Sequence, residues 1–138
     1  KLIPLEKEIA LMNDFIALEK SRFEDRVKVV LKLPKSEAQD ITIPPLILVP
    51  FVENAFKHSL KNETEMATIQ IHLSVSEKNL NFTVTNSKPL DSGITTKNKG
   101  LGLINIKKRL DIIYEDNYSL NINEQPNVYT IHLQIKTA

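Results

Sequence analysis

The 138-residue chain has no cysteine, no tryptophan and only three glycines. Without cysteine it has no disulfide framework, no thiol nucleophile and no thiolate metal site, as is typical of proteins in a reducing compartment. No run of about 18 apolar residues is present, which excludes a membrane-spanning helix from this sequence. Lysine and arginine total 18 against 17 acidic residues, so no overall field attracts nucleic acid or an anionic membrane. We therefore expect no nucleic-acid partner, and any recognition of phosphate must be local.

The remaining composition is that of an ordinary globular domain. Hydrophobic residues make up 41% of the chain and charged residues 25%, and the length suffices for one domain with its own core. The first residues lack the uninterrupted apolar stretch of a signal peptide, and the chain does not begin with methionine. We expect it to be a piece of a longer protein.

Hydrophobic periodicity predicts three helices. The first, over 5–21, has one apolar stripe that packs on its own domain or on a partner helix. The second, over 46–60, is opened by Pro44-Pro45, and Pro50 predicts a kink or a fresh start within it. The third, over 101–114, has an apolar face that consists of Leu103, Ile106, Leu110 and Ile113.

Alternating apolar and polar residues predict a sheet with one face in water. Strands are expected within 26–33 and in two hairpins, with turns at 76–79 and 124–127. His72 and His132 fall on the polar phase, so both should be exposed. Residues 86–99 have no period and predict a long functional loop. With all helices on the other face of the sheet, the predicted architecture is a two-layer α/β sandwich.

A first group of polar residues lies on the second helix. Asn54, Lys57 and His58 stand at i, i+3 and i+4, which places them on one face beside the buried stripe. An amide oxygen, an ammonium and an imidazole can together hold Mg²⁺ and phosphate, because Mg²⁺ needs only one or two protein oxygen ligands besides the phosphates. The alternative is a solvated face on which Glu53 and Lys57 form an i,i+4 ion pair.

A second group lies at the start of the third helix. Gly100 and Gly102 allow backbone N–H groups to approach an anion at a positive helix end, and Lys97 and Lys99 precede them. The alternative is that these glycines serve turn geometry alone. The sequence has neither a Rossmann fingerprint, a Walker A loop, nor a Gly-x-Ser-x-Gly elbow.

In this order, the two groups resemble the ATP-binding domain of LytS-like sensor histidine kinases, in the GHKL superfamily. The likeness covers nearly the whole chain. Glu53-Asn54-Ala55-Phe56-Lys57-His58, preceded by Ile43-Pro44-Pro45-Leu46, looks like the N box of that class. Gly100-Leu101-Gly102-Leu103-Ile104-Asn105 looks like its glycine box, and Pro4-Leu5-Glu6-Lys7-Glu8 like the start of its linker.

The resemblance implies a Bergerat fold, an α+β sandwich whose mixed, mostly antiparallel sheet has helices on one face. Its cofactors would be ATP and Mg²⁺, and residues 88–99 would form a lid over the nucleotide. Asn54 would ligate Mg²⁺, Lys57 would pair with phosphate and His58 would line the pocket. The remaining phosphate-binding and nucleotide-binding residues would be Lys97, Lys99, Gly100, Leu101, Gly102 and Leu103.

Two positions depart from the family pattern. Asn86 stands where GHKL proteins generally have an aspartate that accepts the adenine amine, and a neutral amide oxygen makes the weaker acceptor. Pro50 stands where the ATP-hydrolysing relatives have a water-activating glutamate, which argues against a hydrolase. Glu53 is the only carboxylate of the N box, and acts either as a catalytic base or as the partner of Lys57.

The resemblance also implies an organisation and partners. Residues 1–22 would be the linker helix from a dimerisation domain, and residues 23–138 the catalytic domain. The acceptor histidine would lie upstream, since none of the three histidines present has its context. The full-length protein would be a homodimer at the inner membrane, with this domain in the cytoplasm and a LytTR-type response regulator as partner. The alternatives are a degenerate nucleotide-binding or protein-interaction module on the same fold, and an anti-sigma-type serine kinase, which the linker-like first helix disfavours.

Overall fold

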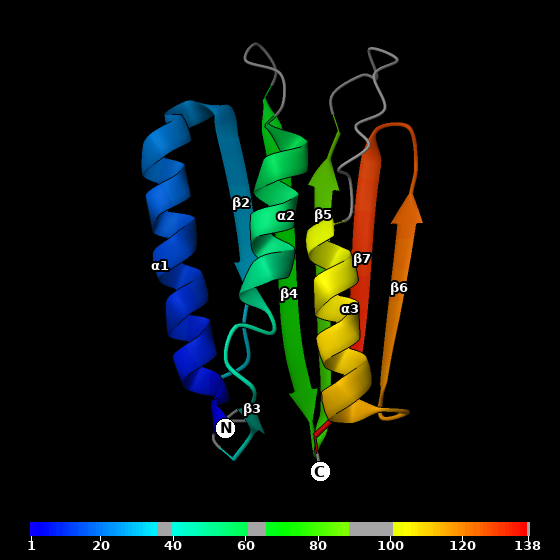
Figure 1. Ribbon diagram of the computed structural model, residues 1–138. Helices are drawn as coiled ribbons and strands as arrows, with labels where there is room; N and C mark the ends of the chain where they lie inside the picture. The colour runs from blue at the N-terminus through cyan, green and yellow to red at the C-terminus, as the bar shows by residue number, and fades with distance from the viewer. Residues whose placement is uncertain (36–39, 61–65, 89–100, 138) are drawn as a thin grey trace.

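The three α-helices of the described residues lie on one face of a five-stranded sheet (Figure 1). The computed structural model describes residues 1–35, 40–60, 66–88 and 101–137. The helices are α1 (Leu5–Phe23), α2 (Val49–Ser59) and α3 (Leu101–Tyr114), with a short 3₁₀ turn η1 (Glu24–Arg26) after α1. The strands are β1 (Ile3–Pro4), β2 (Val27–Lys32), β3 (Thr42–Ile43), β4 (Ala67–Ser76), β5 (Asn79–Ser87), β6 (Tyr118–Glu124) and β7 (Val128–Lys136).

The sheet is mixed and mostly antiparallel. Its strand order is β2-β4-β5-β7-β6, in which β2 and β4 pair in parallel and the other three pairs are antiparallel. The two-residue strands β1 and β3 form a separate antiparallel pair. The expected α+β two-layer sandwich, with helices on one face of such a sheet, is confirmed.

The core lies between the helices and the inner face of the sheet. Alternation along the strands turns apolar side chains inward, and Phe82 of β5 makes an edge contact with Phe51 of α2, with ring centroids 6.3 Å apart. On the outer face His72 is exposed, as predicted, whereas His132 is half-buried and its Nε2 has no hydrogen-bond partner among the described residues. The prediction of exposure was therefore wrong for His132.

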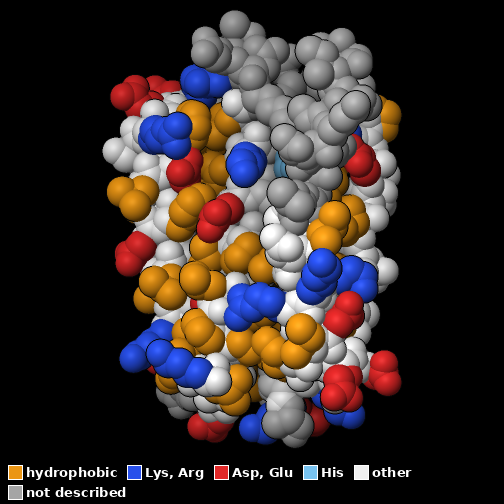
Figure 2. All heavy atoms as spheres, viewed as in Figure 1, with side chains coloured by type: hydrophobic (Ala, Val, Ile, Leu, Met, Phe, Trp, Pro, Cys, Tyr) orange, Lys and Arg blue, Asp and Glu red, His pale blue; other side chains and the backbone are white. Residues whose placement is uncertain are grey.

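Helix α1 packs on this domain rather than only on a partner helix. Leu5, Met12 and Ile16 are buried in the shared core, and Phe15 meets Phe56 of α2 edge-on at 5.7 Å. Figure 2 shows hydrophobic side chains interspersed with charged ones on the helix-covered face of the molecule. No described helix is long and apolar enough to cross a membrane.

Helix α2 begins later than predicted. The two prolines at 44 and 45 lie before the helix, Leu46 has a φ of 58°, and the helix starts only at Val49. Pro50 thus falls in the first turn, where its missing N–H costs no intrahelical hydrogen bond. Of the two expectations for Pro50, the fresh start is confirmed and the kink is wrong.

Two further details differ from the sequence expectations. Asn86 lies on β5 and not in a loop, because its register with Ile69 and Tyr129 continues the ladder to both sides. On α3, Ile113 is 41% exposed, and Tyr114 packs against the core in its place. Tyr114 is eleven residues after Leu103, three helical turns, and so stays on the buried face.

Candidate functional site

The polar residues of α2 divide between a buried edge and a solvent edge. Asn54 and His58, four residues apart, are half-buried, whereas Glu53 and Lys57 are exposed. Among the described residues no ion pair joins Glu53 to Lys57, so the alternative of an i,i+4 pair is not supported. The Glu53 carboxylate and the Lys57 ammonium are therefore both exposed to solvent, where a ligand can contact them.

Tyr129 of β7 lies beside the half-buried edge of α2. Its ring stacks on the His58 imidazole, with centroids 5.8 Å apart and an angle of 24° between the planes. Burial raises the pKa of Tyr129, the Glu124 carboxylate adds to the rise, and a hydrogen-bonding interaction with the Asn54 side chain opposes it. The Asn54 Nδ2 is buried and completes no hydrogen bond of regular geometry with any described residue. Such a group is costly to leave unpaired, which marks the position as one that a ligand can satisfy.

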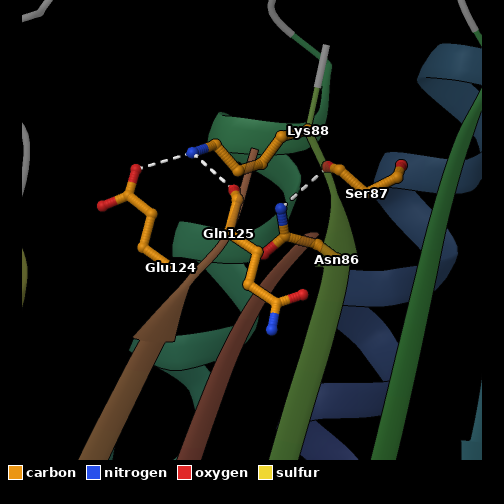
Figure 3. Close-up of polar contacts among 5 residues, drawn as sticks. All are labelled: Asn86, Ser87, Lys88, Glu124 and Gln125. Atoms are coloured by element: carbon orange, nitrogen blue, oxygen red, sulfur yellow. Dashed lines mark hydrogen bonds and ion pairs between the residues drawn. The ribbon is translucent and has the colours of Figure 1, made fainter. Parts of the chain in front are cut away.

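Asn86 lies next to Tyr129 on the inner face of the sheet. The two residues are register partners across β5 and β7, and Asn86 is only 1% exposed. Its Nδ2 donates to the Ser87 carbonyl at 2.9 Å, which fixes the amide and turns Oδ1 away from that carbonyl (Figure 3). The Asn86 Nδ2 is thereby committed to a backbone partner, and its Oδ1 is the atom of this amide that can accept a hydrogen bond from a ligand.

The end of β5 is tied to the neighbouring elements just above Asn86. Lys88 Nζ pairs with Glu124 at 2.7 Å and donates to the Gln125 carbonyl at 3.1 Å, as Figure 3 shows. On the other side, the Ser87 and Ser59 hydroxyls share a hydrogen bond of 3.2 Å. These contacts fix the β6–β7 turn and the end of α2 around the site.

Helix α3 packs against α2 and begins in the half of the molecule in which α2 ends (Figure 1). Leu103 is buried, and a Cβ placed on Gly102 would meet nothing within 4 Å. Packing therefore does not require glycine at position 102, and the bare backbone is open to a ligand. The predicted Lys97, Lys99 and Gly100 lie outside the described residues, and Leu101 is described only as the first residue of α3.

A metal ion at this site would depend on few protein ligands. No group of three or more His, Asp or Glu side chains that could hold a metal occurs in the described part of the chain. Asn54 supplies one amide oxygen at the site, which fits Mg²⁺ because this ion retains waters and binds substrate phosphates. The residues present therefore fit an ion that keeps most of its waters and takes one protein oxygen.

Sequence reasoning missed three residues that shape this region: Tyr129, Glu8 and Arg109. Tyr129 was assigned only to a strand, although its phase placed it on the inner face. Glu8 occupies the buried stripe of α1 between Leu5 and Met12 and is 0% exposed. A charged residue at an apolar position of a helix was the available signal for Glu8.

Comparison with known proteins identifies relatives along most of the chain, although no family model matches. The sensor histidine kinase YesM of Bacillus subtilis is 28% identical over 127 residues, 90% of this chain and 22% of that protein. The sensor protein LytS of Staphylococcus epidermidis is 29% identical over 140 residues, 94% of this chain and 24% of that protein. The chain is homologous to the LytS-like sensor histidine kinases. It spans less than a quarter of the length of these relatives.

Solved histidine kinase structures have the same fold. The catalytic domain of histidine kinase ThkA superposes with a TM-score of 0.65 at 16% identity, covering 99% of this chain and 95% of that one. Full-length ShkA in complex with AMPPNP superposes with a TM-score of 0.69 at 15% identity, covering all of this chain and 31% of that one. The sandwich described above is thus the architecture of histidine kinase catalytic domains.

Proposed function

We propose that this chain is the ATP-binding catalytic domain of a sensor histidine kinase. The observation that carries the proposal is the half-buried Asn54 side chain, whose buried Nδ2 has no hydrogen-bond partner among the described residues. It lies beside Tyr129, the register partner of the buried Asn86. A buried donor without a partner beside an amide oxygen that can accept, at one helix–sheet junction, indicates a polar ligand. The homology to LytS-like kinases and the AMPPNP complex of ShkA support a nucleotide as that ligand.

Each residue has a role in the proposed complex. The Asn54 Oδ1 ligates Mg²⁺, while the exposed Lys57 ammonium pairs with a phosphate and His58 lines the pocket against Tyr129. Asn86 Oδ1 accepts a hydrogen bond from the adenine amine, since its Nδ2 is already committed to Ser87. The ion, when bound, would neutralise charge on the phosphates.

The proposed phosphate-binding site extends to the start of α3. Backbone N–H groups at Gly102 and Leu103 point from a helix N-terminus, where partial positive charge favours anions. In the proposal this phosphate-binding site is completed by four residues predicted from the sequence: Lys97, Lys99, Gly100 and Leu101. The predicted lid over 88–99 lies, apart from Lys88, outside the described residues and stays a prediction.

The reaction proposed is transfer of the ATP γ-phosphate to a histidine nitrogen. The domain contributes by binding and orienting the triphosphate, as is usual in phosphoryl transfer. Glu53 is exposed and unpaired with Lys57, so it remains a candidate base for the incoming imidazole. Pro50 cannot activate water, which favours transfer to a protein over hydrolysis.

The proposal extends to a larger assembly, and similarity to much longer sensor kinases supports it. We propose that residues 1–22 link this domain to a dimerisation domain with the acceptor histidine, and that residues 23–138 form the catalytic domain. The full-length protein would be a homodimer at the inner membrane, with this domain in the cytoplasm. A LytTR-type response regulator would receive the phosphoryl group.

The first test is titration of the chain with ATP, with and without Mg²⁺, by calorimetry. We expect Mg²⁺ to tighten ATP binding to the wild type, and Asn54→Ala to lose most of that gain. Asn13→Ala, which removes an exposed asparagine from α1, is the matched control and should bind like the wild type.

The outcomes separate the candidate functions. If no adenine nucleotide binds, the chain is a degenerate or protein-interaction module on the kinase fold. If ATP binds, mixing the chain with a separately produced dimerisation domain must give acid-labile phosphohistidine. ATP binding without phosphohistidine would leave a nucleotide-binding module and refute the kinase.

A further inference from the structure

The turn that precedes α2 is held by side chains from both neighbouring helices. Glu8 of α1 accepts three backbone hydrogen bonds there: from Leu46 at 2.8 Å, Leu48 at 2.8 Å and Val49 at 3.1 Å. Arg109 of α3 donates to the carbonyls of the same turn, to Leu46 at 2.9 Å and to residue 45 at 3.0 Å. Leu46, which has a φ of 58°, thus donates its N–H to Glu8 of α1 and accepts at its carbonyl from Arg109 of α3.

Helix α2 cannot provide this cap itself. Leu48, at its N-cap position, has no polar side chain, and the first turn contains no acidic residue. The first N–H groups of a helix have no intrahelical partners, and a negative charge near them is favourable. The fully buried Glu8 carboxylate supplies both requirements from 40 residues away in the sequence.

The capped end is close to the proposed magnesium ligand. Asn54 follows Val49 by five residues, a rise of about 7.5 Å along a rigid helix. Arg109 is on the helix whose first turn contains Gly102. The turn therefore connects the helix that carries Asn54 with α1 on one side and with the proposed phosphate-binding helix on the other.

We propose that Glu8 is a positioning residue: its carboxylate, with Arg109, sets the placement of α2 and so the distance between Asn54 and the start of α3. The inference rests on the proposed nucleotide site and adds to it a dependence on α1. A displacement of α1 would change the hydrogen bonds from Glu8 to the start of α2, and the affinity of the site for the magnesium–phosphate group would change as a result. Glu8 touches no ligand and acts only through α2.

The test compares Glu8→Gln with Glu6→Gln, which removes an exposed carboxylate from the same helix. The amide of Glu8→Gln presents a donor to at least one backbone N–H, so the cap is incomplete while the volume is unchanged. In the nucleotide-free protein we expect the NMR signals of the Asn54 side-chain amide and the α2 backbone to shift in Glu8→Gln and to stay in place in Glu6→Gln.

Nucleotide binding provides the second measurement. At a temperature where both variants are folded, the factor by which Mg²⁺ tightens ATP binding should fall about tenfold in Glu8→Gln, equivalent to about 1.4 kcal/mol. Adenosine affinity should be unchanged, because the cap acts on the Asn54 end of the site. A purely structural role would lower the unfolding midpoint and leave this factor at its wild-type value.

A second pair of variants covers the case in which Glu8→Gln does not fold. Arg109→Gln removes the carbonyl side of the grip, and Lys108→Gln, on an exposed neighbour, is its control. Unshifted Asn54 signals in both folded test variants would overturn the inference whether or not ATP binds. If ATP fails to bind the wild type but the signals shift, the proposed function fails and the positioning role stands.

Discussion

Replacing Gly102 by alanine should stabilise the protein and weaken ATP binding. Gly102 is the second residue of α3, and an added Cβ would meet nothing within 4 Å. Alanine is favoured over glycine in a helix interior by about 0.5–1 kcal/mol, so at this terminal position we expect a gain of about 0.5 kcal/mol. No clash offsets this gain.

The loss of binding follows from the same open position. A phosphate oxygen that accepts a hydrogen bond from the Gly102 N–H lies about 2.9 Å from the nitrogen, and a methyl group on the adjacent Cα crowds that approach. Losing one hydrogen bond to a charged group costs about 1.5–3 kcal/mol. Because each 1.4 kcal/mol is a factor of ten, ATP affinity should fall by at least about tenfold.

Two assays on the same samples test the predicted gain in stability and the predicted loss of ATP affinity. Urea unfolding followed by circular dichroism gives the stability, and calorimetry with ATP and with adenosine gives the binding. Adenosine has no phosphate and should bind Gly102→Ala as it binds the wild type. Lys108→Ala, on an exposed residue of the same helix outside the glycine box, is the control for a general effect on α3. A variant that binds ATP within about twofold of the wild type would show that the phosphates do not approach α3 at this residue.

Three further predictions concern stability. Burial raises the folded-state pKa values of Tyr114 and Tyr129, and a hydrogen bond to an aspartate raises that of Tyr118. The stability that these three tyrosines contribute is fully present below about pH 10, the pKa of tyrosine in the unfolded chain, and is lost as the pH rises through the raised values. Unfolding at about pH 9–12, with tyrosinate followed by absorbance at about 295 nm, should show this loss of stability, and tyrosinate formation at about pH 10 in the folded protein would contradict the prediction. Asn86→Asp sets a carboxylate against the carbonyl to which the amide now donates, and should cost about 2 kcal/mol in urea unfolding; wild-type stability would refute that orientation of the amide. Glu8→Ala leaves three backbone donors unpaired and should cost about 3–5 kcal/mol, whereas a cost below about 1 kcal/mol would show that water replaces the carboxylate.

The periodic parts of the molecule were predictable because their patterns are local. The stripe of α1 and the alternation of β4, β5 and β7 each repeat over many residues, so the helix and strands follow from side-chain spacing alone. The order of the two polar groups predicted the resemblance to LytS-like sensor histidine kinases, and the similarity to YesM and LytS bears it out. Neither result required knowledge of how distant segments meet.

The start of α2 was not predictable in this way. Pro44-Pro45 has the composition of a helix start, but the helix begins at Val49 because Glu8 caps it there. A cap supplied from another helix leaves no mark in the sequence around the helix that it caps. Asn86 was likewise assigned to a loop because it opens a stretch without a period, although pairing on both sides keeps it in the sheet.

The candidate site consists largely of residues that local rules misplace. Asn86 is a polar residue on the buried face of a strand, and the Asn54 amide is buried without completing a hydrogen bond. Glu8 is a carboxylate on a buried helix stripe. Each buried polar group is unfavourable for folding unless it has a hydrogen-bond partner. For Glu8 the partners are the backbone N–H groups of the turn before α2. For Asn54 and Asn86 no described part of the chain supplies the missing partner in full. In the proposed complex the adenine amine donates to the Asn86 oxygen, and phosphate oxygens beside the Mg²⁺ accept from the Asn54 Nδ2.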